Sequence, residues 1–112
     1  MRVYMGIDPS DKGGVAYVMG DKLVAQAWPE GEVEIYDALR HVCSQTQDTV
    51  CVMADRVSRY REVIRGMLIA MGVPFRMVHG AEWRTGVLRV QGYSDAMLLA
   101  EHCAKTWEDG EA

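Results

Sequence analysis

The opening of the chain constrains its fold more than any other segment. In residues 3–7, apolar side chains alternate with small or polar ones, which is the two-residue period of a β-strand. Asp8 follows this run directly, and Pro9 and Gly13 interrupt the pattern before a second apolar run at 15–18. The pattern therefore predicts a strand, a turn and a second strand, with a carboxylate at the mouth of the turn.

The carboxylate of Asp8 has two explanations at this level. A charge at the end of a sheet is unfavourable unless it meets a cation, a hydrogen-bond donor or water. A bound metal ion would supply such a partner, because carboxylates are ligands of hard divalent cations. An aspartate that caps its own turn would be satisfied equally well, so the local pattern leaves both interpretations open.

The composition is that of one soluble globular domain spanning residues 1–112. Hydrophobic residues make up 49% of the chain and charged residues 25%, the usual balance for such a domain. The apolar runs are too short to cross a bilayer, and the N-terminus lacks the pattern of a signal peptide. Three cysteines, an odd number, argue against a disulfide framework and for a reducing compartment such as the cytoplasm.

The net charge of −4 speaks against a protein that coats nucleic acid with a uniformly basic surface. It does not exclude DNA binding, because a carboxylate site that holds divalent cations counts as acidic in the sequence but is neutralised when loaded. The basic residues are also clustered, with four arginines in a short stretch: Arg56, Arg59, Arg61 and Arg65.

Periodicity and turn residues predict an α/β arrangement of strands and helices. Strands are expected at residues 3–7, 15–19, 22–27, 50–54 and 75–78, and helices at 32–44, 59–71, 81–88 and 96–105. Ser58 is the expected N-cap of the second helix, and Gly72 is its expected C-cap. This helix has more apolar residues than one narrow stripe needs, which predicts that it also forms the interface of a homodimer; the alternative is a helix fully buried by its own sheet.

Two of the expected strands end in an aspartate, Asp8 and Asp55. In an α/β sheet the first and fourth strands can be neighbours, and the two carboxylates would then share a divalent cation. An environment of oxygen ligands alone suits magnesium. The alternative for Asp55 is a solvated charge at a strand end.

Taken in order along the chain, these motifs form a recognisable set. The set comprises Gly6-Ile7-Asp8-Pro9-Ser10 with Gly13-Gly14, the strand at 50–55, Arg65-Gly66, Gly72-Val73-Pro74, Glu82-Trp83-Arg84 and the helix at 94–104. It resembles the RuvC-type Holliday-junction resolvases, especially their small phage branch, which belong to the ribonuclease-H-like superfamily. Actin-like ATPases open with a similar first motif, but that fold needs two related domains, which 112 residues cannot supply. The resemblance implies an α/β, ribonuclease-H-like fold with a mixed five-stranded sheet flanked by helices.

The resemblance also implies a metal-dependent, structure-selective endonuclease that cuts branched DNA in recombination, repair or phage DNA processing. In such enzymes two divalent cations, Mg²⁺ or Mn²⁺, activate water and stabilise the leaving oxygen. Asp8 would bridge both ions, and Asp55, where the family usually has glutamate, would hold one. Asp109 would complete the cage, with Glu108 and Glu111 as rivals for that position. A fourth acid is not evident, since the chain ends where the family's last helix would begin.

Positive side chains would then contact the DNA backbone. The candidates are Lys12, Arg56, Arg59, Arg61 and Arg84. The plain alternatives are a solvated turn lysine and an exposed helix face whose arginines pair with Glu62, while the terminal acids could form only a solvated tail. A second function therefore stays open, a catalytically impaired ribonuclease-H-like module that binds DNA or another partner. The expected partners are branched DNA and a second copy of the chain, in a bacterial or phage-infected cell.

Overall fold

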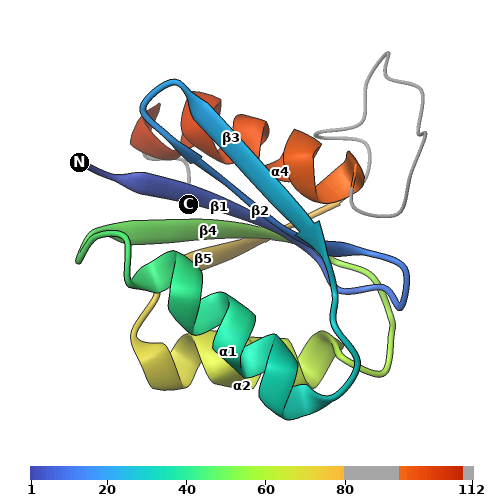
Figure 1. Ribbon diagram of the computed structural model, residues 1–112. Coiled ribbons are helices and arrows are strands. Elements are labelled where there is room, and N and C mark those ends of the chain that lie inside the picture. The colour runs from blue at the N-terminus through green and yellow to red at the C-terminus, as the bar shows by residue number, and fades with distance from the viewer. Residues whose placement is uncertain (80–93, 110–112) are drawn as a thin grey trace.

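The computed structural model describes residues 1–79 and 94–109, which form an α/β structure around one five-stranded sheet (Figure 1). The strands are β1 (Val3–Asp8), β2 (Gly14–Met19), β3 (Lys22–Ala27), β4 (Thr49–Ala54) and β5 (Phe75–Val78). Their order across the sheet is β3-β2-β1-β4-β5. The predicted α/β fold with a mixed five-stranded sheet is confirmed.

The central strand β1 has an antiparallel neighbour on one side and a parallel neighbour on the other. β1 and β2 pair as an antiparallel strand–turn–strand unit, as the opening of the chain predicts. β1 and β4 are parallel, with Ile7 opposite Met53, and β4 is parallel to β5. Because these three strands run in the same direction, their carboxyl ends meet at one edge of the sheet. Asp8 and Asp55 therefore lie at the same edge, as predicted.

Helices cover both faces of the sheet. α1 (Glu32–Cys43) and α2 (Arg61–Met71) lie on one face, and α4 (Ser94–Thr106) lies on the other, followed by the short 3₁₀ helix η1 (Trp107–Asp109) (Figure 1). Within the described part of the chain, no helix has both the length and the apolar character needed to span a membrane.

The alternation along β1 divides the interior into two layers. Val3, Met5 and Ile7 are fully buried on the side of α1 and α2. The same layer holds the buried residues of these two helices, which are Ile35, Leu39, Val42, Ile64 and Leu68. Since side chains of a strand alternate between faces, the residues between them on β1 face α4.

Gly6 lets α4 lie directly against β1. A Cβ at this position would collide with the backbone of the helix, at Ala96 O and Ala100 N. Asp8 lies two residues further along the strand and so faces the same side of the sheet as Gly6. The carboxylate is therefore turned toward the layer that holds α4.

The predicted element boundaries agree with the structure to within two residues wherever the structure describes them. Gly72 adopts the left-handed conformation of a C-cap, with φ 72°. The predicted helix at 81–88 lies outside the described residues.

The predicted N-cap at Ser58 is wrong. α2 begins at Arg61, and its N-cap is Tyr60, which makes no side-chain capping bond. Ser58 Oγ instead donates a hydrogen bond of 2.7 Å to the carbonyl of Pro9. This hydroxyl therefore ties the loop before α2 to the turn that follows Asp8.

Candidate active site

Asp8 closes β1 at the edge where the parallel strands end, and its side chain is fully buried. The turn after it folds tightly over the carboxylate, since a Cβ at Gly13 would lie only 2.7 Å from Asp8 Cγ. Trp28 Nε1 donates a hydrogen bond of 2.7 Å to the Asp8 carbonyl. Gly13 is thus required because the turn passes so close to the Asp8 side chain. Gly13 and Trp28 together fix the position of the acid.

The two carboxylate oxygens of Asp8 have different partners. Oδ1 accepts hydrogen bonds from the Ser10 backbone N–H (3.2 Å) and from Ser10 Oγ (3.0 Å), which is the turn-capping role considered for this residue. Oδ2 accepts a hydrogen bond of 2.9 Å from Arg56 Nη1. One oxygen therefore stabilises the turn, and the other faces a positive charge.

A second buried carboxylate, Asp95, lies on the other side of that guanidinium and was missed in the sequence. Arg56 Nη2 donates to Asp95 Oδ2 at 2.8 Å, and the Asp95 side chain is fully buried. Asp95 is in the first turn of α4, where the helix dipole favours a negative charge. The available signal was its spacing, because Asp95 precedes Leu99 by one helical turn and so lies on the apolar stripe of the helix, where a charge needs a partner.

Arg56 bridges these two acids from the loop between β4 and α2, and its side chain is 20% exposed. The sequence had suggested an exposed position from which Arg56 would follow a DNA backbone, and the structure places it inside the site instead. Buried carboxylates need such a partner, because desolvation costs several kcal/mol for each ion. We refer to these three side chains as the Asp8–Arg56–Asp95 cluster.

Asp55 lies beside the cluster, directly after β4, with its side chain 31% exposed. Its backbone N–H donates to Val78 O at 2.8 Å and so continues the pairing of β4 with β5. Its Oδ1 accepts from Arg61 Nε (3.2 Å) and Nη2 (2.7 Å), and its Oδ2 is 4.0 Å from His79 Nδ1. The hydrogen bond to Asp55 raises the pKa of Arg61. Arg61, a predicted DNA contact, is therefore engaged with an acid at the rim of the site.

The end of α4 lies far from the cluster. Glu108 Oε2 accepts a hydrogen bond of 2.6 Å from Tyr4 Oη, near the start of β1. α4 has 13 residues, which is about 20 Å of helix at ~1.5 Å per residue, so η1 and Asp109 lie at the opposite end of β1 from Asp8. The structure therefore places Glu108 and the end of the helix away from the site, and the acid that approaches Asp8 is Asp95.

Asp8 and Asp95 thus form a buried pair, and Asp55 is a third carboxylate at the rim. This arrangement differs from the predicted set of metal ligands, Asp8, Asp55 and Asp109. Among residues 1–79 and 94–109, no three His, Cys, Asp or Glu side chains converge in a way that could hold a metal ion. The predicted ligand Glu111 and the predicted DNA contact Arg84 lie outside the described residues.

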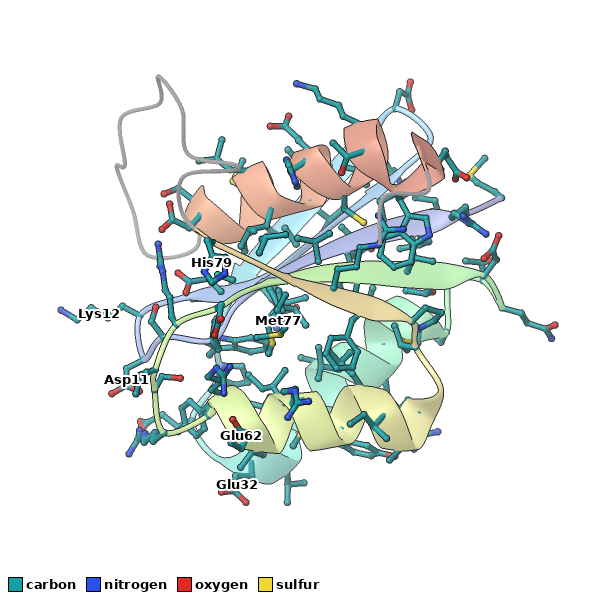
Figure 2. The ribbon with its side chains drawn as sticks, turned by 180° about the vertical axis from the view of Figure 1, so that it is seen from behind. Asp11, Lys12, Glu32, Glu62, Met77 and His79 are labelled. Atoms are coloured by element: carbon teal, nitrogen blue, oxygen red, sulfur yellow. The ribbon has the colours of Figure 1, made fainter. Side chains whose placement is uncertain are left out.

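A shallow groove of about 470 Å³ adjoins the cluster and carries the remaining predicted DNA contacts. Its walls are the turn after β1 and the loop before α2, with the lining residues Ser10, Asp11, Lys12, Val57, Ser58 and Arg59. Lys12 is exposed and points outward, at the same end of the sheet as His79 (Figure 2). Arg59 lies over the ring of Tyr60 at 4.7 Å, and its Nε is 3.5 Å from Asp11 Oδ1. Both predicted cations therefore line one surface.

The three cysteines, Cys43, Cys51 and Cys103, are free thiols away from this edge of the sheet. Burial raises the pKa of Cys103 to about 12 and that of Cys51 well above its usual value. A neutral, buried thiol is a poor nucleophile and a poor metal ligand. The chemistry of the site therefore depends on carboxylate oxygens.

The same arrangement of sheet and helices occurs in a structure of known function. RuvC of T. thermophilus, in complex with a Holliday junction substrate, superposes with a TM-score of 0.69 over 98% of this chain and 97% of that chain. The chain has a ribonuclease-H-like fold. The identity in that alignment is 14%, so the likeness establishes the fold, and the activity has to be argued from the site. No protein-family model matches the sequence, and no curated protein sequence matches it.

Proposed function

We propose that this protein is a metal-dependent endonuclease that acts on branched DNA. The observation that carries the proposal is the pair of fully buried carboxylates, Asp8 and Asp95, where β1 ends and α4 begins. Buried acids of this kind destabilise a fold unless they are paired or used. They occur here in the fold of a RuvC whose structure holds a Holliday junction, which supports branched DNA as the substrate class.

The donor atoms at this edge of the sheet are of the chemical type that hard divalent cations such as Mg²⁺ or Mn²⁺ bind, although the described side chains would have to turn toward one another to hold an ion. Asp8 and Asp95 supply carboxylate oxygens, which are the ligands these ions prefer. Asp55 would be a further ligand from the rim once its carboxylate turns away from Arg61. When bound, a pair of such ions activates a water molecule and stabilises the leaving oxygen of a phosphodiester.

The groove supplies the surface on which the DNA would be positioned. Lys12 and Arg59 lie on opposite walls of the groove, and Ser10, which caps Asp8, lies between the groove and the acids. Positive side chains along such a surface contact phosphates without reading sequence. Acidic side chains would then lie at the cluster, and the positive side chains Lys12 and Arg59 would lie along the groove beside it.

A second copy of the chain is also part of the proposal. Ile64 and Leu68 of α2 are buried in the core, whereas Ile69 on the same helix is 61% exposed. A four-way junction has two equivalent strands to cut, and a two-fold dimer matches that symmetry. We propose that α2 contributes to the dimer interface through Ile69.

The test is cleavage of a four-way junction and of a plain duplex across a titration of Mg²⁺ or Mn²⁺. We expect the wild type to cut the junction at millimolar metal, because two acids at the cluster and one at the rim hold a cation less firmly than a full cage. Asp8→Asn and Asp95→Asn keep the side-chain size but remove a charge that the cations need, so both should fold and neither should cut. Arg2→Gln, at the opposite end of β1, is the matched control and should cut as the wild type does. Cutting by Asp8→Asn at the wild-type rate would refute the nuclease assignment.

The second candidate function is a DNA-binding module without cleavage. Arg56 favours it, because its guanidinium already neutralises charge on Asp8 and Asp95. Such a module would bind the junction in the presence and absence of metal, and it would not cut at any metal concentration. The titration above separates the two functions directly.

A further inference from the structure

We infer that Arg56 is a built-in competitor of the divalent cation at the Asp8–Arg56–Asp95 cluster, and that it must leave before the metal binds. This inference rests on the proposed function and names how the site would be controlled. Arg56 would hold the two acids together in the metal-free protein and would set the metal concentration at which the site is loaded.

The guanidinium of Arg56 already uses one oxygen of each acid. Arg56 directs its two terminal nitrogens to different acids, with Nη1 2.9 Å from Asp8 Oδ2 and Nη2 2.8 Å from Asp95 Oδ2. A divalent cation held by these two acids would need carboxylate oxygens that now accept hydrogen bonds from the guanidinium. A dication and a guanidinium on the same two oxygens also repel each other.

The same contacts explain why Arg56 stays when no metal is bound. Both carboxylates are fully buried, and two buried like charges facing each other destabilise the fold. The planar fork of arginine can bind two carboxylates at once, which the single ammonium of lysine cannot match. Arg56 therefore supplies positive charge to both acids at this edge of the sheet.

Arg56 also has a way out of the cluster. It belongs to the loop between β4 and α2, and its side chain is 20% exposed, in contrast to both acids. The next residue, Val57, is 99% exposed and lines the groove with Arg59. Rotation of the Arg56 side chain toward the groove would vacate the space between the acids and would leave β1, β4 and α4 in place.

The experiment compares metal binding in the wild type and in Arg56→Gln, without DNA. Arg2→Gln is the matched control, because Arg2 also bridges two carboxylates, Asp48 and Glu108, both at 3.0 Å, but at the other end of β1. The thermal unfolding midpoint is measured in metal-free buffer and with Mn²⁺, and the Mn²⁺ dissociation constant is measured by calorimetry.

We expect Arg56→Gln to have a lower thermal midpoint than the wild type in metal-free buffer and a larger rise on addition of Mn²⁺, because a ligand that binds the folded state more tightly stabilises it more. The Mn²⁺ dissociation constant of Arg56→Gln should be lower than that of the wild type by about tenfold or more, because Mn²⁺ no longer has to displace a positive charge from the two acids. Arg2→Gln should respond to Mn²⁺ as the wild type does.

Equal Mn²⁺ dissociation constants in the wild type and Arg56→Gln would overturn the inference, and so would the absence of Mn²⁺ binding in both. If Arg56→Gln does not fold, Arg56→Lys replaces it, and its dissociation constant should lie below that of the wild type, since one ammonium engages the two acids less well. A constant equal to the wild-type value would again overturn the inference. The nuclease assignment is judged separately, by cleavage of the junction, so the two can fail independently.

Discussion

Replacement of Gly6 by alanine tests whether contact between α4 and β1 builds the site. A Cβ at position 6 would lie 2.2 Å from Ala100 N and 2.5 Å from Ala96 O, whereas an ordinary Cβ contact is 3.4–4 Å. The obstructing atoms are helix backbone, which cannot rotate away. α4 must therefore move from the sheet by about 1.2 Å, the difference between 3.4 and 2.2 Å.

The expected loss of stability follows from this displacement. Overpacking of a well-filled interior costs about 1–3 kcal/mol, and a clash of backbone against a strand belongs at the upper end, about 3 kcal/mol. For a chain of this size each kcal/mol lowers the thermal unfolding midpoint by about 4 °C, so Gly6→Ala should unfold roughly 12 °C below the wild type. If the start of α4 moves with the rest, the 2.8 Å bond from Arg56 to Asp95 lengthens beyond hydrogen-bond range.

The assay is urea and thermal unfolding followed by circular dichroism, with Gly66→Ala as the matched control. Gly66 lies in α2, and a Cβ there would meet nothing within 4 Å. Because alanine is favoured over glycine in a helix by about 1 kcal/mol, Gly66→Ala should be more stable than the wild type. The reasoning is refuted if Gly6→Ala is as stable as the wild type, or if the two variants shift stability in the same direction.

Three further predictions concern the groove, the thiols and the dimer. Lys12→Ala and Arg59→Ala should each weaken junction binding and reduce the slope of log affinity against log salt concentration by about one. Unchanged slopes in anisotropy titrations would show that the groove does not contact the DNA. In the folded protein at about pH 8, Cys43 should react with a thiol reagent before Cys103, because a pKa of about 12 leaves Cys103 almost without thiolate, and equal rates would contradict this. Ile69→Asp should convert a dimer into a folded monomer in sedimentation, since Ile69 is 61% exposed; a monomeric wild type at tens of micromolar would contradict the dimer.

Local patterns were enough to predict the strands, most helix boundaries and the placement of Asp8 and Asp55 at one edge of the sheet. The alternation in residues 3–7 predicted β1 and the face it buries, because a strand turns successive side chains to opposite sides. Gly72 predicted the end of α2, because only a residue that tolerates positive φ ends a helix in this way. Asp8 and Asp55 were predicted at one edge because parallel neighbours end together. Each of these properties depends on backbone geometry within one element or between adjacent strands.

The third acid and its counter-charge depended on the tertiary structure. Asp95 was overlooked in favour of the terminal acids, and Arg56 was interpreted as a surface cation. Their positions follow from the path of α4, which the absent Cβ of Gly6 allows to cross β1 so that its first turn lies beside Asp8. Spacing along the chain does not report such a contact, because it arises between a strand, a loop and a helix that only the packed interior brings together.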